Sequence, residues 1–244
     1  IQYGSIGADS DGFNGADNSA YYSGTNRLTF GHGCVDDNED ADVILHEYGH
    51  AITHDISNSW TGGDTGAMGE GFGDYWGGAY SYGTPNGPSF HPEWIYSWDG
   101  HGNGNPCWAG RILNALGAQY VHSTYYGAHQ QIPGGYWSDE LWSTPLFQAL
   151  VTLVEDEGQT RESVDAIYLE AQFGLGAGIK MRDMANAIVA TARELQPAGP
   201  HADVMTEKFL AHAIILAPVP AIGLESFAVV AEPSGNGAPD PGET

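Results

Sequence analysis

Two short aromatic runs stand near the start of the chain, and apolar residues at a helical spacing follow them. Residues 20–23 and 27–30 carry tyrosine, leucine and phenylalanine on either side of Gly24-Thr25-Asn26. Glycine and asparagine favour tight turns, whereas aromatic residues favour strands. This part of the chain therefore predicts two short strands joined by a turn.

Two helices are predicted next. The acidic residues 36–40 suit a helix N-terminus, because carboxylates stabilise the positive end of the helix dipole. The helix predicted over about 39–55 turns four apolar side chains toward a core, namely Val43, Ile44, Ala51 and Ile52. A second helix is predicted over about 66–80 despite its glycines, and residues 83–106 are predicted to form a loop.

From about residue 107 onward the pattern is that of helices. The apolar residues that carry it are Ile112, Leu116 and Tyr120, and later Met181, Met184, Ile188 and Leu195. Short strands are predicted around Val219 and over 227–230. The tail 232–242 has the composition of a linker, which suggests a further module beyond residue 244.

These elements predict an α+β fold in one domain-sized chain of 244 residues. A small β-rich N-terminal portion covers 1–35 and a mainly α-helical portion covers 36–218, with a functional cleft expected between them. Residues 219–244 hold the terminal strands and the Pro/Gly-rich linker.

The net charge of the chain limits the kinds of molecule that it can bind. The chain has 31 acidic and 7 basic residues and a formal charge of -24. Phosphate binding needs a basic surface, so nucleic acid is excluded as a partner, and anionic membrane surfaces are disfavoured. No apolar run approaches the roughly 18 residues that would cross a bilayer.

The sharpest chemical signal is His46-Glu47-Tyr48-Gly49-His50. Histidines at i and i+4 lie one turn apart on one helical face, so both imidazoles can bind a single Zn²⁺. Glu47 then lies beside the metal, where it can take a proton from a bound water. The motif alone does not decide the class of enzyme.

The third ligand decides it. A metzincin would place a histidine six residues after His50 with a glycine midway, but Ile56 and Thr53 stand there. His54 lies one further turn along the helix and is interpreted as an ordinary helix-end histidine. Glu70, 20 residues after His50, is the better candidate.

Asp74 follows Glu70 by one helical turn, in Gly69-Glu70-Gly71-Phe72-Gly73-Asp74. There it can accept the free N–H of a ligand histidine, which fixes the tautomer and the ring orientation.

At this point the chain resembles the thermolysin-like zinc peptidases, the gluzincins, and among them the fungalysins. The two segments 46–50 and 66–74 look like the family's zinc helices and are the most specific part of the resemblance. Further similar passages are 18–22 with 28–31, His129 with Trp137-Ser138 and Leu141-Trp142, and Arg182-Asp183 with 185–192.

The resemblance implies a thermolysin-like catalytic domain with zinc in the cleft and a set of residue roles. His46, His50 and Glu70 become the zinc ligands, Glu47 the general base and Asp74 the partner of a ligand histidine. His129 becomes the donor that stabilises the oxyanion. It is preferred over His122 because it precedes the stretch Gly134–Ser138.

Four residues are candidates for substrate binding. The backbone of Ser19, Ala20 and Tyr21 is similar to the family's edge strand, which pairs with an extended peptide. Arg111 matches a family arginine that contacts a substrate carbonyl, and an ordinary arginine on a helix surface is an equal alternative.

The chain departs from the family in two places. Only 45 residues precede His46, so the N-terminal lobe is reduced or was removed. The family's tyrosine between the zinc helices has no clear match, because Trp60 and Thr61 occupy that region, and which residue replaces it is left open.

The sequence also contains candidates for calcium sites and for a disulfide. Two acidic groups are candidates for structural Ca²⁺, namely Asp9 with Asp11 and Asp36 with Asp37 and Asp40, although a solvated acidic face is the simpler interpretation. Cys34 and Cys107 can form one disulfide, and the sequence leaves their state open.

The sequence therefore predicts a secreted zinc endopeptidase acting on peptides or proteins. Residues 1–4 lack the features of a signal peptide, so in an exported protein they would begin either a mature form or a shortened chain. Two alternatives stay open. One is a zinc hydrolase with a single protein target, and the other is a non-catalytic protein in which zinc only stabilises the fold.

Overall fold

The computed structural model describes residues 17–31, 33, 35–101 and 108–217. Six α-helices and three two-stranded antiparallel sheets form this part of the chain, so the predicted α+β class is confirmed. The predicted strands near 219 and 227–230, the linker, the two cysteines, Asp9 and Asp11 lie outside the described residues. The predicted domain boundaries stay a prediction.

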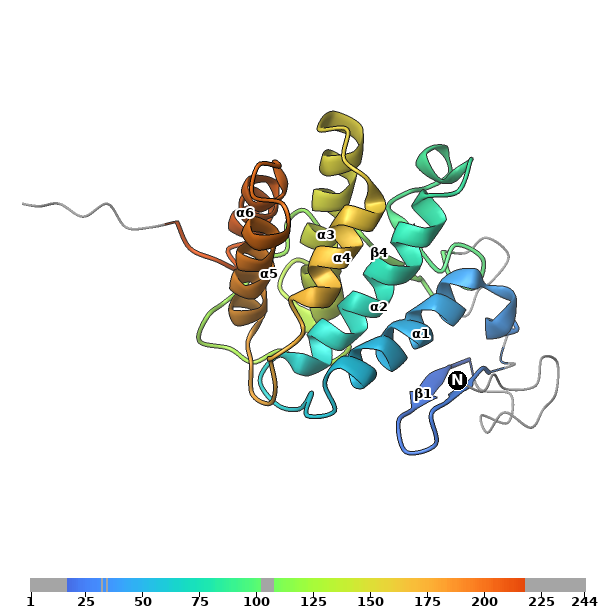
Figure 1. Ribbon diagram of the computed structural model, residues 1–244. Coiled ribbons are helices and arrows are strands. Elements are labelled where there is room, and N and C mark those ends of the chain that lie inside the picture. Colours follow the sequence, from blue (N-terminus) through green and yellow to red (C-terminus); the bar gives the residue numbers. More distant parts are fainter. Residues whose placement is uncertain (1–16, 32, 34, 102–107, 218–244) are drawn as a thin grey trace, which may run out of the picture.

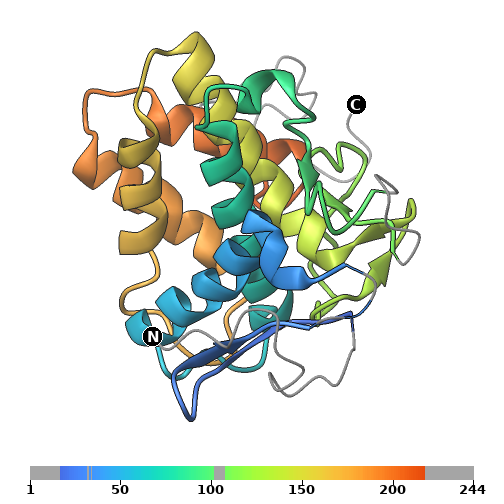
Figure 2. The same ribbon diagram turned by 90° about the vertical axis from the view of Figure 1, so that its right-hand side faces the viewer.

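The first sheet is the hairpin predicted at the N-terminal end. Strand β1 (Ala20–Tyr22) pairs with β2 (Arg27–Thr29), with Tyr21 opposite Leu28. Leu28 is fully buried, whereas Tyr22 at the end of β1 is exposed. The hairpin lies alongside the helix α1 (Figure 2), and this contact places β1 next to the residues of the H-E-x-x-H motif.

The helices α1 (Ala41–Ile56) and α2 (Thr65–Tyr82) lie side by side (Figure 1) and correspond to the two predicted zinc helices. Asp40 caps α1 by accepting the N–H of Asp42 at 2.8 Å. It also accepts the N–H groups of Trp98 and Asp99 at 3.0 and 2.9 Å. Asp40 therefore ties the start of α1 to the 94–99 segment. A short 3₁₀ turn, Asp37–Glu39, precedes Asp40.

The remaining helices complete the core. α3 (Ser138–Val151) packs on α2. Three further helices lie on the side of α2 and α3 that is away from β1 (Figure 1), namely α4 (Arg161–Glu170), α5 (Met181–Leu195) and α6 (His201–Ala211). A five-residue π-helical stretch, Thr152–Asp156, follows α3. The largest fully buried side chains include Tyr75, Met68, Leu146, Tyr168 and Phe209.

The prediction of helix from residue 107 onward is wrong for residues 108–137. This segment contains β4 (Arg111–Ile112), paired with β3 (Trp94–Ile95), and β5 (Gln131–Ile132), paired with β6 (Tyr136–Trp137), joined by loops. Leu116 is 65% exposed, so it does not belong to the buried face of a helix. In the preceding loop, Gly87–Ser89 forms one 3₁₀ turn.

A buried aspartate holds this irregular segment to the helices. Asp64, which is fully buried just before α2, accepts a hydrogen bond from the Tyr120 hydroxyl at 2.6 Å. It also accepts the N–H groups of Tyr126 and Met181 at 3.0 Å each. Because a buried carboxylate is costly unless it is hydrogen-bonded, these contacts outweigh the helical spacing of Ile112, Leu116 and Tyr120.

Within the described residues, no helix is both long and apolar enough to cross a bilayer.

Gly71 sets the separation of α2 and α3. A Cβ atom at this position would lie 2.6 Å from the Asp139 carbonyl oxygen and 2.9 Å from Trp142 Cβ. We therefore expect Gly71→Ala to lower the free energy of unfolding by about 1–3 kcal/mol in urea titrations, although alanine normally favours a helix. Gly24→Ala, where nothing lies within 4 Å, serves as the control. A Gly71→Ala variant as stable as the parent would contradict the close approach of the two helices.

Candidate metal centre

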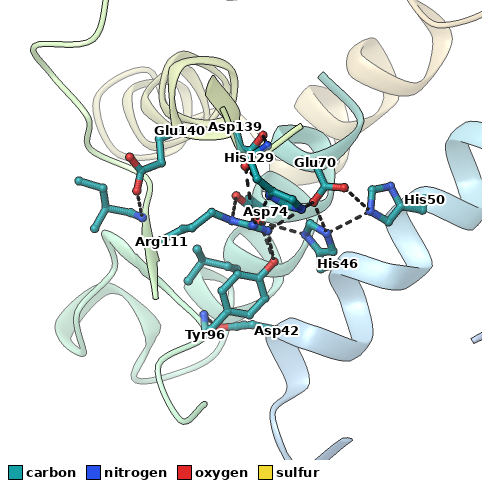
Figure 3. Close-up of polar contacts among 12 residues, drawn as sticks. Asp42, His46, His50, Glu70, Asp74, Tyr96, Arg111, His129, Asp139 and Glu140 are labelled. Atoms are coloured by element: carbon teal, nitrogen blue, oxygen red, sulfur yellow. Dashed lines mark hydrogen bonds and ion pairs between the residues drawn. The ribbon is translucent and has the colours of Figure 1, made fainter. Parts of the chain in front are cut away.

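Three side chains from α1 and α2 meet at one point (Figure 3). His46 Nε2 and His50 Nε2, one turn apart on α1, are separated by 3.1 Å. From α2, Glu70 places Oε2 at 3.2 Å from His46 Nε2 and Oε1 at 3.4 Å from His50 Nε2. The three residues form a group that could hold a metal ion.

The separations fit a zinc ion. Ligand atoms at 2.0–2.2 Å from a tetrahedral centre lie about 3.3–3.6 Å from one another. The three distances, 3.1, 3.2 and 3.4 Å, are close to such an edge. Two imidazole nitrogens and one carboxylate are also a donor set that zinc accepts in catalytic sites. The residues present therefore fit zinc.

Glycines allow the two helices to come this close. A Cβ at Gly73 would lie 2.6 Å from His46 Nδ1, and a Cβ at Gly49 would lie 3.0 Å from Gly73 Cα. The glycines of α2, which weaken its helix propensity, thus leave room for the His46 ring.

Asp74 orients His46. It is fully buried, and its Oδ1 lies 2.9 Å from His46 Nδ1. Burial alone would raise the pKa of Asp74, but Arg111 and His46 lower the pKa to about 2. The ionised carboxylate therefore accepts a hydrogen bond from Nδ1–H, which leaves the lone pair of His46 Nε2 directed at the candidate metal position.

The carboxylates around His46 also favour a proton on its ring. Burial disfavours the charged imidazole, yet the hydrogen bonds to Asp74 and Glu70 raise the pKa of His46 to about 10. The pKa of Glu70 lies well below its usual value despite burial, because His46 and His50 bind it. A metal ion would therefore compete with a proton at His46, as is usual for histidine sites.

Arg111 lies in β4 and is buried, so the alternative of an arginine on a helix surface is wrong. Its Nε and Nη2 bind the two oxygens of Asp74 at 2.8 and 2.7 Å. Its Nη1 lies 3.1 Å from His129 Nδ1. Arg111 therefore compensates the charge of Asp74 and reaches the histidine at the edge of the site.

His129 lies at the metal centre and His122 does not. His129 Nε2 lies 3.4 Å from Glu70 Oε2, whereas His122 Nε2 bonds the carbonyl of Ala213 at 2.9 Å. His129 is held in a left-handed backbone conformation, with φ of 52°, a strained position for a residue with a side chain.

Asp139, at the start of α3, fixes His129 and was missed by sequence reasoning. Its two oxygens accept the His129 backbone N–H at 3.0 Å and the ring Nδ1–H at 2.8 Å. The hydrogen bond to Asp139 raises the pKa of His129, and Glu70 adds to the effect. Because Nδ1 donates to Asp139, Nε2 is the nitrogen that faces the metal centre. The only feature of the sequence that could have pointed to Asp139 is its position directly after the Trp137-Ser138 pair.

Tyr96 was also missed. Its hydroxyl donates to Asp74 Oδ1 at 2.7 Å and accepts from Arg111 Nη2 at 2.7 Å, and its ring packs edge-on against His46. Its φ is 64°, and its N–H donates to Asp42 at 3.0 Å. A tyrosine inside a Gly/Pro-rich loop carries no periodic signal.

Glu47 is buried in the same cleft, with 6% exposure. Its Oε2 has no hydrogen-bond partner among the residues that the structure describes. An unpartnered buried carboxylate oxygen is costly. A water or a metal in the cleft would therefore supply the missing partner.

The cleft measures about 1010 Å³ and contains every predicted site residue except Asp74, which is buried beneath it. Ser19, Ala20 and Tyr21 form part of its wall. In the described part of the chain, β1 pairs only with β2, so its other edge has no strand neighbour. The Tyr21 hydroxyl lies 3.3 Å from His54 Nδ1, so His54 contacts the strand.

Trp60 and Thr61, which occupy the region of the family tyrosine, both line the cleft. The Trp60 indole N–H donates to the Thr65 carbonyl at 3.0 Å, and this hydrogen bond holds Trp60 against the start of α2. The residue that replaces the family tyrosine therefore stays open.

The acidic residues considered for calcium are arranged differently from the prediction. Asp40 caps α1, and among the described residues neither Asp40 nor Asp36 is grouped with Asp37. Asp37 instead groups with Asp17 and Asp99.

Comparison with known proteins supports the fold. No family model matches the chain. No curated protein sequence matches it either. Among solved structures, the precursor of protealysin, a metalloproteinase from Serratia proteamaculans, is similar with a TM-score of 0.60 at 14% sequence identity. The match covers 82% of this chain and 66% of that chain. The chain thus shares the fold of a metalloproteinase, and the closer resemblance to fungalysins has no support.

We expect Asp74→Asn to weaken zinc binding by about 10–100-fold, because the amide no longer fixes the His46 tautomer or balances Arg111. Competition with a colourimetric zinc chelator measures the affinity. Asp165→Asn, which changes a buried carboxylate bound to Tyr75 and Arg161, is the matched control. Equal zinc affinity in the Asp74 variant and the parent would contradict the role of Asp74.

Proposed function

We propose that the protein is a secreted, zinc-dependent endopeptidase of the thermolysin-like type. His46, His50 and Glu70 would hold the zinc. The observation that carries the proposal is the convergence of their three donor atoms at 3.1–3.4 Å next to a buried, unpartnered oxygen of Glu47. The fold shared with a metalloproteinase supports it.

When bound, zinc supplies an acidified water and an electrophile for the carbonyl of the scissile bond. Glu47 takes the proton of the attacking water and passes it to the leaving amine. Its burial without a partner supports this role, because the water would then be the group that satisfies Oε2.

His129 donates from Nε2 to the oxygen of the attacked carbonyl as negative charge develops there. Asp139 supports this role in two ways. It keeps the ring proton on Nδ1 and prevents rotation of the ring, and it stabilises the protonated imidazole, whose pKa it raises.

A peptide would lie along the cleft as an added strand on β1. The backbone of Ser19, Ala20 and Tyr21 would pair with it. Arg111 would contact a substrate carbonyl through Nη1, the guanidinium nitrogen that does not bind Asp74. The acidic surface disfavours nucleic acid, so peptides or proteins are the proposed substrates.

We expect Glu47→Gln to retain zinc and to lose peptide cleavage, because glutamine keeps the shape of the side chain but cannot take a proton. Zinc content by atomic absorption and hydrolysis of unfolded casein measure the two properties. Glu93→Gln, which changes a half-buried carboxylate that is not part of the cleft wall, is the control. Full activity in the Glu47 variant would refute the assigned base, and full zinc without activity in the parent would favour a stabilising role for the metal.

We expect His129→Ala to lower kcat by about 10²–10³-fold with a much smaller change in KM, because the donor acts on charge that develops in the transition state. Zinc content should be unchanged. His122→Ala, which alters a histidine outside the cleft, should keep kcat near the parent value. An equal loss in both variants would contradict a specific role for His129.

A further inference from the structure

A second group of carboxylates lines the same cleft. Asp17 lies before β1, Asp37 begins the 3₁₀ turn before α1, and Asp99 follows the 94–95 strand. One carboxylate oxygen from each lies within 4.8 Å of the other two. Three segments that are far apart in sequence thus bring negative charge to one point.

Asp37 is the centre of this group and lacks a partner for one oxygen. Its residue is 2% exposed, and Ser19 Oγ and the Gly31 N–H bind Oδ2 at 2.6 and 3.4 Å. Within the described part of the chain, Oδ1 has no hydrogen-bond partner. Burial raises the pKa of Asp37 to about 7, with Asp99 and Asp17 adding to the effect and the Ser19 hydrogen bond opposing it.

The dimensions of the group suit a hard divalent cation. Oxygen ligands lie 2.3–2.6 Å from Ca²⁺, so two of them can be up to about 4.6–5.2 Å apart across the ion. The oxygens of Asp17, Asp37 and Asp99 lie within 4.8 Å of one another, so one such ion could reach all three. The group contains carboxylates alone, without the nitrogen or sulfur donors that zinc prefers.

We propose that Asp17, Asp37 and Asp99 form a second metal site, which binds Ca²⁺ and joins β1 to the start of α1 and to the 94–99 segment. The ion would give Asp37 Oδ1 its missing partner and offset the repulsion between the buried Asp37 and Asp99 and the exposed Asp17.

The contacts around the group show what such an ion would hold together. Ser19, which adjoins β1, donates to Asp37, and the Trp108 indole donates to Asp99 Oδ2 at 2.8 Å. The N–H of Asp99 bonds Asp40, the cap of α1. The ion would therefore fix the strand edge relative to α1. An effect on peptide binding rests on the proposed peptidase function, whereas the cation site itself does not.

Tb³⁺, a luminescent substitute for Ca²⁺, tests the site in the zinc-loaded protein. Trp108 contacts Asp99, so excitation of tryptophan should produce Tb³⁺ emission that Ca²⁺ displaces. Asp37→Asn should weaken Tb³⁺ binding at least tenfold. Glu39→Gln, which removes an exposed charge from the same 3₁₀ turn, should leave it unchanged. Absence of sensitised emission that Ca²⁺ displaces, or equal affinity in Asp37→Asn, would overturn the site.

Thermal unfolding separates loss of the site from loss of the fold. At about 100 times its Kd, Ca²⁺ should raise the melting temperature of the parent by roughly 5–10 °C and leave that of Asp37→Asn unchanged. Without Ca²⁺, Asp37→Asn should melt no lower than the parent, because the variant removes one repelling charge.

The Glu47→Gln variant distinguishes failure of the proposed Ca²⁺ site from failure of the proposed peptidase function. Glu47→Gln should bind Tb³⁺ as the parent does, whether or not the peptidase function holds. If Asp37→Asn instead changes only the cleavage of peptides with lysine or arginine, while no Tb³⁺ binds, the carboxylates recognise a substrate cation and the proposed metal site is wrong.

Discussion

The structure of the site depends on a single buried carboxylate, that of Asp74. Three elements converge on it, because His46 from α1, Arg111 from β4 and the Tyr96 hydroxyl all lie within 2.9 Å of its oxygens. A fully buried charge is costly unless it is paired and hydrogen-bonded, and the removal of one partner leaves the others uncompensated. The irregular 94–112 region is therefore held against α2 by the same contact that sets the orientation of the first proposed ligand.

Negative charge accumulates around this contact and makes a cation at the centre favourable. Glu47, Glu70 and Asp139 line the cleft together with His46 and His129, whereas Arg111 is the one arginine or lysine that the described residues place in its wall. Arg111 is already bound to Asp74 through two nitrogens. A divalent ion between His46, His50 and Glu70 would balance part of the remaining charge, and the same argument applies to the group of Asp17, Asp37 and Asp99.

The sequence was sufficient to predict those features whose residues lie close together along the chain. The i, i+4 spacing of His46 and His50, the one-turn offset from Glu70 to Asp74 and the aromatic runs of the hairpin all follow from the period of a helix or a strand. Helix was wrongly predicted over 108–137, because the spacing of Ile112, Leu116 and Tyr120 imitates a helix while hydrogen bonds to Asp64 decide the conformation. Tyr96 and Asp139 could not be found, because each acts through a contact with residues far away in sequence. Asp37 likewise meets Asp17 and Asp99 rather than its neighbours in sequence.

The most direct test of this account is a zinc anomalous-difference map from a crystal of the purified protein. The account predicts one strong peak at about 2.0–2.2 Å from His46 Nε2, His50 Nε2 and a Glu70 oxygen, with Asp74 in contact with His46 on the far side of the ring. A map without a peak there, or with Glu70 turned away from it, would contradict the central claim.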